Sequence, residues 1–590
     1  MKHRSLLREL IMTNLLLWLL AACATPPAVS IGRQASAGDS EPAIALPASP
    51  TTLPPAATTL PPTATATPQP TLLPPASPTP TTPPPSPVPT IAPPTFANAP
   101  QPDLAQVTAS SGVSLTLVLP ANSGIWQYAA NSFIHPLALD VHDDTAYLLD
   151  AGRVLALDWG QPTAPVVLLQ PGMLIDGVAV LEPLDLSVSG EELLVLDRAG
   201  DVYAYAFASQ QWTLDRYDRP MRPDSANHYF VALAGSENGR FLLDTNYNYV
   251  QQYAAAPRDR LWTLPDTRGI DLSVVNDTVY VLLQELDTRQ GLLYPYQETA
   301  LLGRFQPALA LTQARQVVAT ATAVYVLDMD GQRLLALQPD TGQLLAVWQT
   351  PPETSAIWSD GSRLVLAGRD RLVFVNEPQR VAWVPGVPLL AGIQPHDPAV
   401  LGALPPLQLP IGNSLPARDL QLPGAPRHYR FGVHQGVDLY WRKGRPVTAV
   451  APGTIIRATT TYTNPAPSEF DFWYNETHTL GYTSAAGLDF YRGRQVWIQH
   501  EGGLLSRYAH LDSIAADIIT GTQVAQGQLL GTVGNSGSPS SLTPGNPDTH
   551  VHFDLWLGDH YVGQYLRPVE TRDWLERLLG IADAAVSVEG

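Results

Sequence analysis

The stretch "VYVLDMDGQRLLALQ", from Val324 to Gln338, consists of two apolar runs joined by a short polar segment. Two such runs around a polar break are typical of a β-hairpin. Phrases of the same kind begin at five other positions: Ala146, Leu193, Arg240, Val279 and Arg363. They recur about every 40–47 residues, a period found in the blades of β-propellers. We therefore expect a mainly β protein with a six-bladed β-propeller between about residues 105 and 395.

An aspartate closes the first run in four of the six phrases, at Asp150, Asp197, Asp244 and Asp328. Gln284 and Ala367 stand at the equivalent positions of the other two. Repeated carboxylates suggest metal sites, but one aspartate per blade at a tight turn more often serves the turn itself. We expect these aspartates to be structural.

The chain begins like an export signal. Basic residues precede the apolar run from Leu10 to Leu20, which is too short to span a bilayer comfortably, and the run leads into "LAAC", ending at Cys23. This ending resembles the lipobox of bacterial lipoproteins, in which cleavage leaves the cysteine as a lipidated N-terminus. Residues 1–23 are therefore predicted to be a lipoprotein signal with Cys23 as the lipidation site. The alternative is an ordinary secretory signal with an incidental cysteine.

Residues 24–104 are dominated by proline, threonine, alanine and serine. Such a composition cannot build an apolar core, so we expect a disordered tether. The formal net charge of the whole chain is −19, which argues against a nucleic-acid partner because such partners require a basic surface.

The C-terminal third holds most of the histidines, and two phrases could bind a metal: "GVHQGVDLYW" from Gly432 and "HVHFDLW" from His550. In the second phrase, alternation places His550 and His552 on one face of a strand. In the first, His434 and Asp438 would lie about 13 Å apart on a straight strand, so the backbone must bend between them, and Gly436 allows this. Each phrase alone is weak evidence, because polar strand faces and glycine turns are common.

Taken together, five phrases occur in the order found in the LytM/lysostaphin-type M23 metallopeptidases: "GVHQGVDL", "GRPVTAVAPGTI", "VWIQHEGGLLSRYAHL", "VAQGQLLGTVGNSG" and "HVHFDLW". The resemblance covers about Arg430 to Leu557. It implies an antiparallel-β peptidase domain, which we place at residues 429–580 after a linker at 396–428. The phrase "VETRDWLERLLG" predicts a short amphipathic helix near its end.

The resemblance also implies one Zn²⁺ per chain, held by His434, Asp438 and His552. His510 and His550 fill the positions of the family's catalytic histidines, one accepting the proton of the attacking water and the other donating. Which residue has which role stays open. Asp554 lies on the same strand face and could orient a ligand histidine, and His500 is expected to be structural.

Residues 459–491 form an insertion where the family usually has a short connection, and they are rich in aromatic side chains. Long connections in compact domains are usually functional or disordered, and this one is too aromatic for disorder. One interpretation is a wall of the substrate groove, with Phe472, Trp473 and Tyr474 as candidate contacts. The other is a hairpin whose aromatic residues cover the domain's own core.

These features together predict a lipid-anchored peptidoglycan endopeptidase on the extracytoplasmic side of the bacterial cell envelope. The family's substrates are cell-wall peptides, and the propeller would dock to or sense a protein or glycan ligand. Two alternatives are a non-catalytic LytM-type activator of a partner hydrolase and a surface binding scaffold centred on the propeller. The first is disfavoured because all five metal-binding and catalytic positions are filled.

Overall fold

The computed structural model describes residues 123–581 except 130–131, 217–227, 254–259, 298–299, 308, 329–331, 376–381, 388–400, 402, 544 and 546–547. The predicted signal, Cys23 and the tether lie outside the described residues and stay predictions. Within the part that is described, no helix combines the length and apolar character that crossing a membrane requires.

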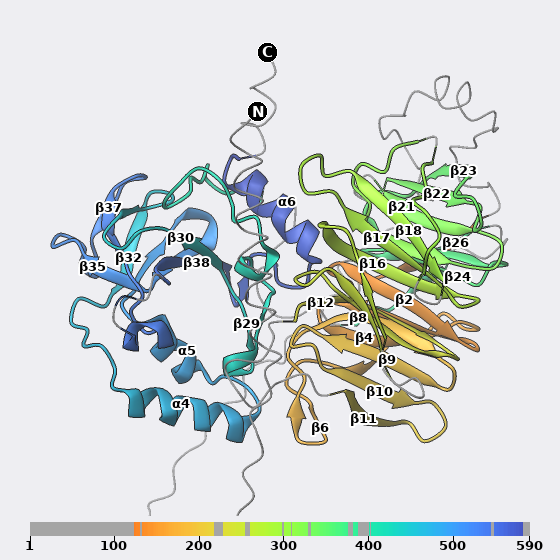
Figure 1. Ribbon diagram of the computed structural model, residues 1–590, viewed down its shortest axis with the longest axis horizontal. Helices are drawn as coiled ribbons and strands as arrows, with labels where there is room; N and C mark the ends of the chain where they lie inside the picture. The colour runs from red at the N-terminus through yellow and green to blue at the C-terminus, as the bar shows by residue number, and fades with distance from the viewer. Residues whose placement is uncertain are drawn as a thin grey trace, which may run out of the picture. The chain divides into compact units, whose positions relative to one another are not determined.

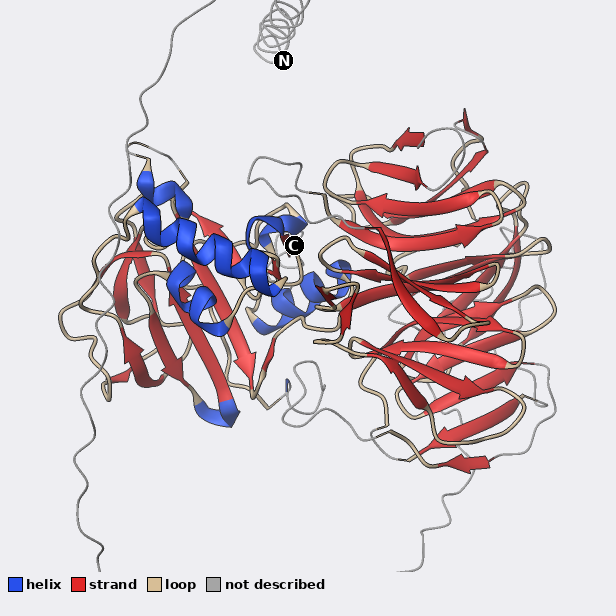
Figure 2. Cartoon of the chain, turned by 90° about the horizontal axis from the view of Figure 1, so that it is seen from below, coloured by secondary structure: helices blue, strands red, loops and turns tan. Residues whose placement is uncertain are grey.

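Five consecutive four-stranded antiparallel sheets are the first five blades of a β-propeller (Figures 1 and 2). Blade one contains β2 (Pro136–His142), β3 (Thr145–Asp150), β4 (Arg153–Asp158) and β5 (Val166–Leu169). Blade two contains β8 (Pro183–Ser189), β9 (Glu192–Asp197), β10 (Val202–Ala206) and β11 (Gln211–Arg216), and the hairpin of β6 (Leu174–Ile175) and β7 (Val178–Ala179) precedes it. Blade three contains β12 (Phe230–Ser236), β13 (Gly239–Asp244), β14 (Tyr249–Tyr253) and β15 (Arg260–Thr263). Blade four contains β16 (Arg268–Val275), β17 (Thr278–Gln284), β18 (Gly291–Gln297) and β19 (Ala300–Leu301). Blade five contains β20 (Gln316–Ala319), β21 (Val324–Asp328), β22 (Arg333–Leu337) and β23 (Leu344–Gln349).

The sixth blade joins the two ends of the repeat region. Its strands are β24 (Thr354–Ser359), β25 (Leu364–Gly368), β26 (Arg371–Val375), β1 (Gly124–Tyr128) and β27 (Ala382–Val384), in that order across the sheet. The first strand of the described chain thus pairs antiparallel with β26 from the last repeat. This pairing closes the ring, and the predicted six-bladed propeller is confirmed.

The repeated aspartates are fully buried, and Asp150, Asp197 and Asp328 accept from backbone N–H groups at the entry to their blades, whereas Asp244 accepts from those of Asn246 and Tyr247 in the turn that follows it. Asp150 accepts from the N–H groups of Ile134 and His135 at 2.9 and 2.7 Å, and Asp328 accepts from Thr312 and Gln313 at 3.2 and 2.7 Å. Because buried N–H groups need an acceptor, these carboxylates stabilise the turns between blades. The structural interpretation of the aspartates is confirmed.

The C-terminal domain is built on a larger antiparallel sheet. Its order is β30 (Val437–Tyr440), β38 (His550–Leu557), β34 (Leu504–Ala509), β33 (Val496–Gln499), β32 (Gly453–Ala458) and β36 (Gln523–Val524), with β39 (His560–Tyr561) paired to β38. A smaller sheet contains β31 (Pro446–Thr448), β37 (Leu529–Val533) and β35 (Leu511–Ile514), and β28 (Pro426–Arg427) pairs with β29 (Gly432–Val433). The short 3₁₀ segments are η1 (Asp419–Gln421), η2 (His428–Arg430), η3 (Glu501–Gly503) and η4 (Pro539–Leu542). The predicted C-terminal helix is α6 (Pro568–Leu578).

The insertion at 459–491 forms two helices, α4 (Pro467–Leu480) and α5 (Ala485–Arg492), where a loop or hairpin was considered. Pro467 starts α4 at the first helical position, and Gly481, with φ of 75°, ends it in the left-handed conformation. Ser484 caps α5 by accepting from the N–H of Gly487 at 3.1 Å. The two helices lie beside each other at one side of the domain's sheet (Figures 1 and 2).

The segment before the first metal-binding phrase packs into the C-terminal domain. Leu407, Ile411 and Leu422 are buried and belong to the same apolar core as the strands of the large sheet. We call residues 412–427 the strap. Although the sequence placed the strap within a linker, it is part of the folded domain.

Candidate metal centre

Strand pairing brings the two metal-binding phrases together. β30 and β38 are antiparallel neighbours, with Asp438 opposite His552, and His434 lies in the bend between β29 and β30. A Cβ at Gly436 would lie 2.3 Å from a carboxylate oxygen of Asp554, so only glycine fits at this bend. The bend that the sequence predicted therefore also provides room for the neighbouring strand.

Three buried ligand atoms form a nearly equilateral triangle. Nε2 of His434, Oδ1 of Asp438 and Nδ1 of His552 lie 2.9 Å from one another in each pair. These are the three residues that the sequence assigned to the metal, and they form a group able to hold one ion.

Each imidazole of the triangle has an acceptor on its far side. Nδ1 of His434 lies 2.9 Å from the carbonyl oxygen of Leu422, and Nε2 of His552 contacts a carboxylate oxygen of Asp554. A carbonyl and a carboxylate only accept, so these far nitrogens carry the hydrogen in the neutral rings. Each ring therefore presents a lone pair to the triangle, beside the carboxylate oxygen of Asp438.

Three acceptors in van der Waals contact require a positive charge between them. One proton on His552 would satisfy only part of the triangle; its pKa is raised because Asp554 and Asp438 outweigh the effect of burial. A divalent ion would satisfy all three acceptors at once. Two histidines and one carboxylate with a fourth position for water are a typical catalytic zinc set, so the residues fit this metal.

Charged residues around the triangle fix its electrostatics. Nη2 of Arg427 lies 2.7 Å from Oδ2 of Asp438. Burial would raise the pKa of Asp438, but His434 and Arg427 hold it well below its ordinary value. Burial and Arg427 lower the pKa of His434 to about 3. Near neutral pH both groups are therefore in the unprotonated form that binds a metal.

The two predicted catalytic histidines lie beside the triangle. The ring of His510 is centred 4.7 Å from that of His550 and 5.9 Å from that of His552. Nδ1 of His510 donates to the carbonyl oxygen of Ser536 at 2.7 Å, which leaves Nε2 as an acceptor. His510 has a φ of 59°, a left-handed conformation uncommon for residues other than glycine and often found at functional sites.

Both catalytic candidates are neutral at physiological pH. Burial and the neighbouring His550 and His552 hold the pKa of His510 well below its ordinary value. Burial also lowers the pKa of His550, against the opposing effect of Asp438. A neutral imidazole can accept a proton at one nitrogen and donate a hydrogen bond from the other, as acid–base catalysis requires.

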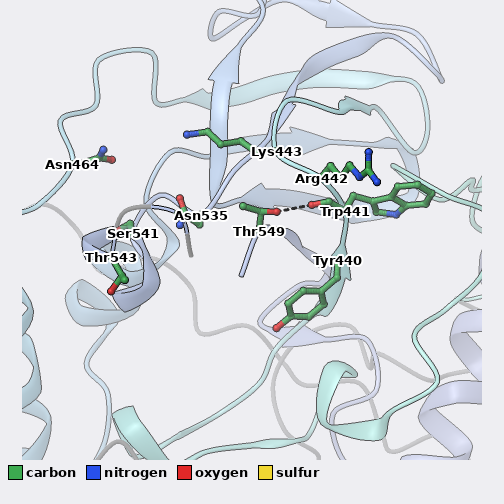
Figure 3. Close-up of a pocket in the computed structure, with 10 residues that line it drawn as sticks. Tyr440, Trp441, Arg442, Lys443, Asn464, Asn535, Ser541, Thr543 and Thr549 are labelled. Carbon is green, nitrogen blue, oxygen red and sulfur yellow. Dashed lines mark hydrogen bonds between the residues drawn. The ribbon is translucent and has the colours of Figure 1, made fainter. Parts of the chain in front are cut away.

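A groove of about 730 Å³ opens next to the end of β30 (Figure 3). Tyr440 lines it and stacks on the ring of His550 with centroids 4.8 Å apart. Among its lining residues, Thr549 donates to the carbonyl oxygen of Trp441 at 2.6 Å. The other lining residues are Arg442, Lys443, Asn464, Asn535, Ser541, Thr543 and Gly545. The volume suits a peptide-sized ligand.

The predicted substrate contacts of the insertion lie on α4, and none of them lines this groove. Phe472 is 60% exposed, whereas Trp473 packs on the ring of Phe490 with centroids 5.7 Å apart. Tyr474 packs against His478 at 4.3 Å. Asn464, at the start of the insertion, does line the groove. A substrate-binding role for these three aromatic residues stays a prediction.

Sequence reasoning missed several residues that support the site. Arg492, at the end of α5, lies 3.1 Å from Asp554 and donates to Gln435 at 2.8 Å. The end of α5 therefore holds Asp554, the carboxylate that contacts His552. Arg427 and the carbonyl of Leu422 belong to the strap, where no motif marks them. His500 was expected to be structural, and it bonds Pro452 and Ser506 at 2.8 and 2.7 Å, away from the triangle.

Residues 476–564 match the family model described as Peptidase family M23. The match includes His510, His550 and His552 and begins after His434 and Asp438 in the chain. Together with the fold it confirms the predicted resemblance. No curated protein matches the chain.

Solved structures with similar parts include the catalytic domain of the antimicrobial peptidase lysostaphin from Staphylococcus simulans. It is 20% identical with a TM-score of 0.16, covering 24% of this chain and 80% of that chain. The catalytic domain of the M23 protein EnpA from Enterococcus faecalis, an A109H mutant, is 23% identical with a TM-score of 0.15, covering 23% and 76%. BamB from Moraxella catarrhalis is 14% identical with a TM-score of 0.28, covering 44% and 93%.

Proposed function

From the peptidase family M23 domain at its C-terminus, we propose that this protein is a zinc-dependent endopeptidase that cleaves the peptides of peptidoglycan. The observation that carries the proposal is the triangle of His434, Asp438 and His552, with three acceptors facing one point. Two further histidines stand beside it, and Tyr440, which stacks on one of them, lines a groove.

The ligand set would hold one Zn²⁺, which supplies a Lewis acid and lowers the pKa of a bound water toward about 7. Leu422 and Asp554 fix the two ligand imidazoles by accepting their far hydrogens. Arg427 holds the carboxylate of Asp438 in its ionised form. These contacts set the geometry before substrate arrives.

The tautomer of His510 supports a division of roles between the two catalytic histidines. With its Nδ1 hydrogen bonded to Ser536, Nε2 of His510 accepts a proton from the attacking water and returns it to the leaving amine. His550 is the remaining donor and stabilises the oxyanion of the tetrahedral intermediate. Tyr440 keeps the His550 ring in place by stacking on it.

The family supports the proposed substrate, and the N-terminal sequence pattern supports the proposed location of the protein. Peptidoglycan lies outside the cytoplasmic membrane, where a chain lipidated at Cys23 and tethered by residues 24–104 would be held. Cys23→Ser should release the protein from the membrane fraction. If Cys23→Ser fractionates with membranes like the wild type, the anchor is elsewhere.

Digestion of purified cell-wall fragments by the full chain, with products identified by mass spectrometry, tests the activity. New amino termini at a single type of peptide bond are expected, and chelation should abolish them. His478→Ala is a matched control, since this histidine of the same domain packs on Phe431 away from the triangle. A zinc-loaded chain that binds wall but releases no peptide would instead support a non-catalytic activator.

A further inference from the structure

We propose that the propeller positions the metal ligands, with Arg268 of blade four acting through Asp419 of the strap. This inference rests on the metal site of the proposed function, although not on its peptidase activity. The propeller would then act on the C-terminal domain, in addition to binding any ligand of its own.

The first step leads from the metal ligands to the strap. His434 is bound to the strap twice: its Nδ1 donates to the carbonyl oxygen of Leu422 at 2.9 Å, and its backbone N–H donates to Ala425 at 2.7 Å. The second ligand, Asp438, accepts from Arg427 at 2.7 Å. Two of the three metal ligands are therefore oriented by one short segment outside the large sheet.

The second step leads from the strap to two buried arginines. Asp419 is 8% exposed and accepts from Nε of Arg268 at 2.6 Å and from Nη2 of Arg572 at 2.9 Å. Both arginines also donate to the carbonyl oxygen of Ala417, at 3.3 and 3.1 Å. The carbonyl oxygen of Asp419 accepts from the N–H of Leu422 at 3.0 Å. The residue held by the arginines is thus bonded directly to the residue that orients His434.

The third step concerns blade four, in which Gln284 replaces the repeated aspartate. In blades one and five the repeated aspartate pairs with an arginine of its own blade, as Asp328 does with Arg333. In blade four the equivalent residue is Gln284, a neutral acceptor that Arg268 contacts at 2.7 Å. A neutral partner does not compensate the positive charge of Arg268. A buried charge needs a counter-charge, and the carboxylate of Asp419 supplies it. This ion pair links the strap to the propeller.

A second propeller arginine holds the strap closer to the metal. Arg198, which is 1% exposed, pairs with Glu182 at 3.0 Å and donates to the carbonyl oxygen of Gly424 at 3.3 Å. A Cβ at Gly424 would lie 2.2 Å from Nη1 of Arg198, and its φ is 89°, so glycine is required there. The N–H of Gly424 in turn donates to the carbonyl oxygen of His434 at 2.7 Å. Arginines of two blades thus contact the strap, the segment that orients His434 and Asp438.

The expected consequence is a change in metal affinity. If Asp419 loses Arg268, the Leu422 carbonyl is held less firmly and His434 is oriented less well for a metal. Replacing an outer partner of a metal ligand typically weakens affinity by about 10–100-fold. Because Arg268 acts on Leu422 through two further hydrogen bonds, we expect an effect at the lower end of this range, about a 10-fold weaker zinc affinity for Arg268→Gln.

The test compares two arginine variants of the full chain. Arg315 has 4% exposure and pairs with Asp573 of α6 at 2.7 Å, so it joins the propeller to the helix of Arg572 through a carboxylate that lies outside the strap. Zinc dissociation constants measured by chelator competition should rise about 10-fold for Arg268→Gln and less than about 2-fold for Arg315→Gln. Equal constants for all three proteins, or equal losses in both variants, would overturn the proposal.

Two further measurements keep the result interpretable. Arg268→Lys retains the charge opposite Asp419, so its zinc affinity should lie between those of Arg268→Gln and the wild type. If Arg268→Gln does not fold, the zinc dissociation constants of Arg268→Lys and Arg315→Lys are compared instead, and the constant should rise more for Arg268→Lys. Repeating the titrations in a His510→Ala background removes the proposed proton acceptor while leaving the ligands. The Arg268 effect should persist there, and its loss would contradict the positioning role even if the peptidase proposal stands.

Discussion

Buried carboxylates occur in both halves of this protein, but they face different partners. In the propeller, Asp150 and Asp328 accept from backbone N–H groups and arginines, so these partners are all donors. In the C-terminal domain, Asp438 has Arg427 on one oxygen and two histidine lone pairs on the other. A carboxylate surrounded by donors is structurally complete, whereas one that shares its space with other acceptors needs a cation. The partners of an aspartate, more than its burial, distinguish a structural role from a metal-binding one.

The largest expected effect comes from breaking the triangle. His552→Ala should reduce the zinc content from about one per chain to near zero, because two ligands hold a zinc ion far less tightly than three. Elemental analysis after dialysis measures this. Asp328→Asn is the contrasting variant and should keep its zinc; loss of metal there would erase the distinction between the two kinds of aspartate.

The next effect concerns catalysis without metal loss. His510→Ala should retain zinc and lower turnover on wall fragments by roughly 10²–10⁴-fold, the usual contribution of an acid–base group. Turnover and zinc content are measured on the same preparation. Near-normal turnover would remove His510 from the mechanism and leave His550 as the candidate proton acceptor.

Removing a structural aspartate should destabilise the fold without changing the turnover per zinc. Asp328→Ala leaves buried N–H groups and Arg333 without their acceptor, and we expect a loss of about 3–5 kcal/mol in the free energy of unfolding. Urea denaturation measures the loss. Turnover per zinc at low temperature should stay within about 2-fold of wild type, because substitutions distant from a site usually act independently of it. A large fall in turnover per zinc would show that the propeller core acts on the site directly.

Acidification should destabilise the metal-free protein. The pKa of His434 is about 3 in the folded chain, because of burial and Arg427, and about 6.5 in the unfolded chain. Between these values the unfolded state binds more protons, so the free energy of unfolding falls as the pH is lowered. For this residue the slope is about 1.4 kcal/mol per pH unit. Chelator-treated wild type and His434→Asn, unfolded in urea at several pH values, should differ by this slope; parallel curves would contradict it.

The smallest expected effect is at the surface of the insertion. Phe472 is exposed, so Phe472→Ala should change the free energy of unfolding by less than about 0.5 kcal/mol. If its ring contacts substrate, the KM for wall fragments rises while zinc content is unchanged. An unchanged KM would confine α4 to a structural role, with its aromatic residues covering the domain.

The sequence predicted the propeller well because its evidence is local and repeated. Each phrase such as Val324 to Gln338 carries its own hairpin pattern, and six of them at one period leave few alternative folds. The helices of the insertion were harder to predict. Their aromatic content fits a core-covering hairpin as well as a helix, and Pro467, Ser484 and Gly481 become helix ends only once the segment is packed.

The sequence by itself predicted which residues could bind a metal, because the order of its motifs along the chain resembles that of the M23 metallopeptidases. Only the tertiary structure decided how those residues are held. The carbonyl of Leu422 carries no side-chain signal, and the link from Arg268 to Asp419 joins residues 151 positions apart. Gln284 was visible in the sequence as a departure from the repeat. Its role depends on which carboxylate pairs with the neighbouring Arg268, and that pairing with Asp419 forms only in the folded chain, where both charges are buried.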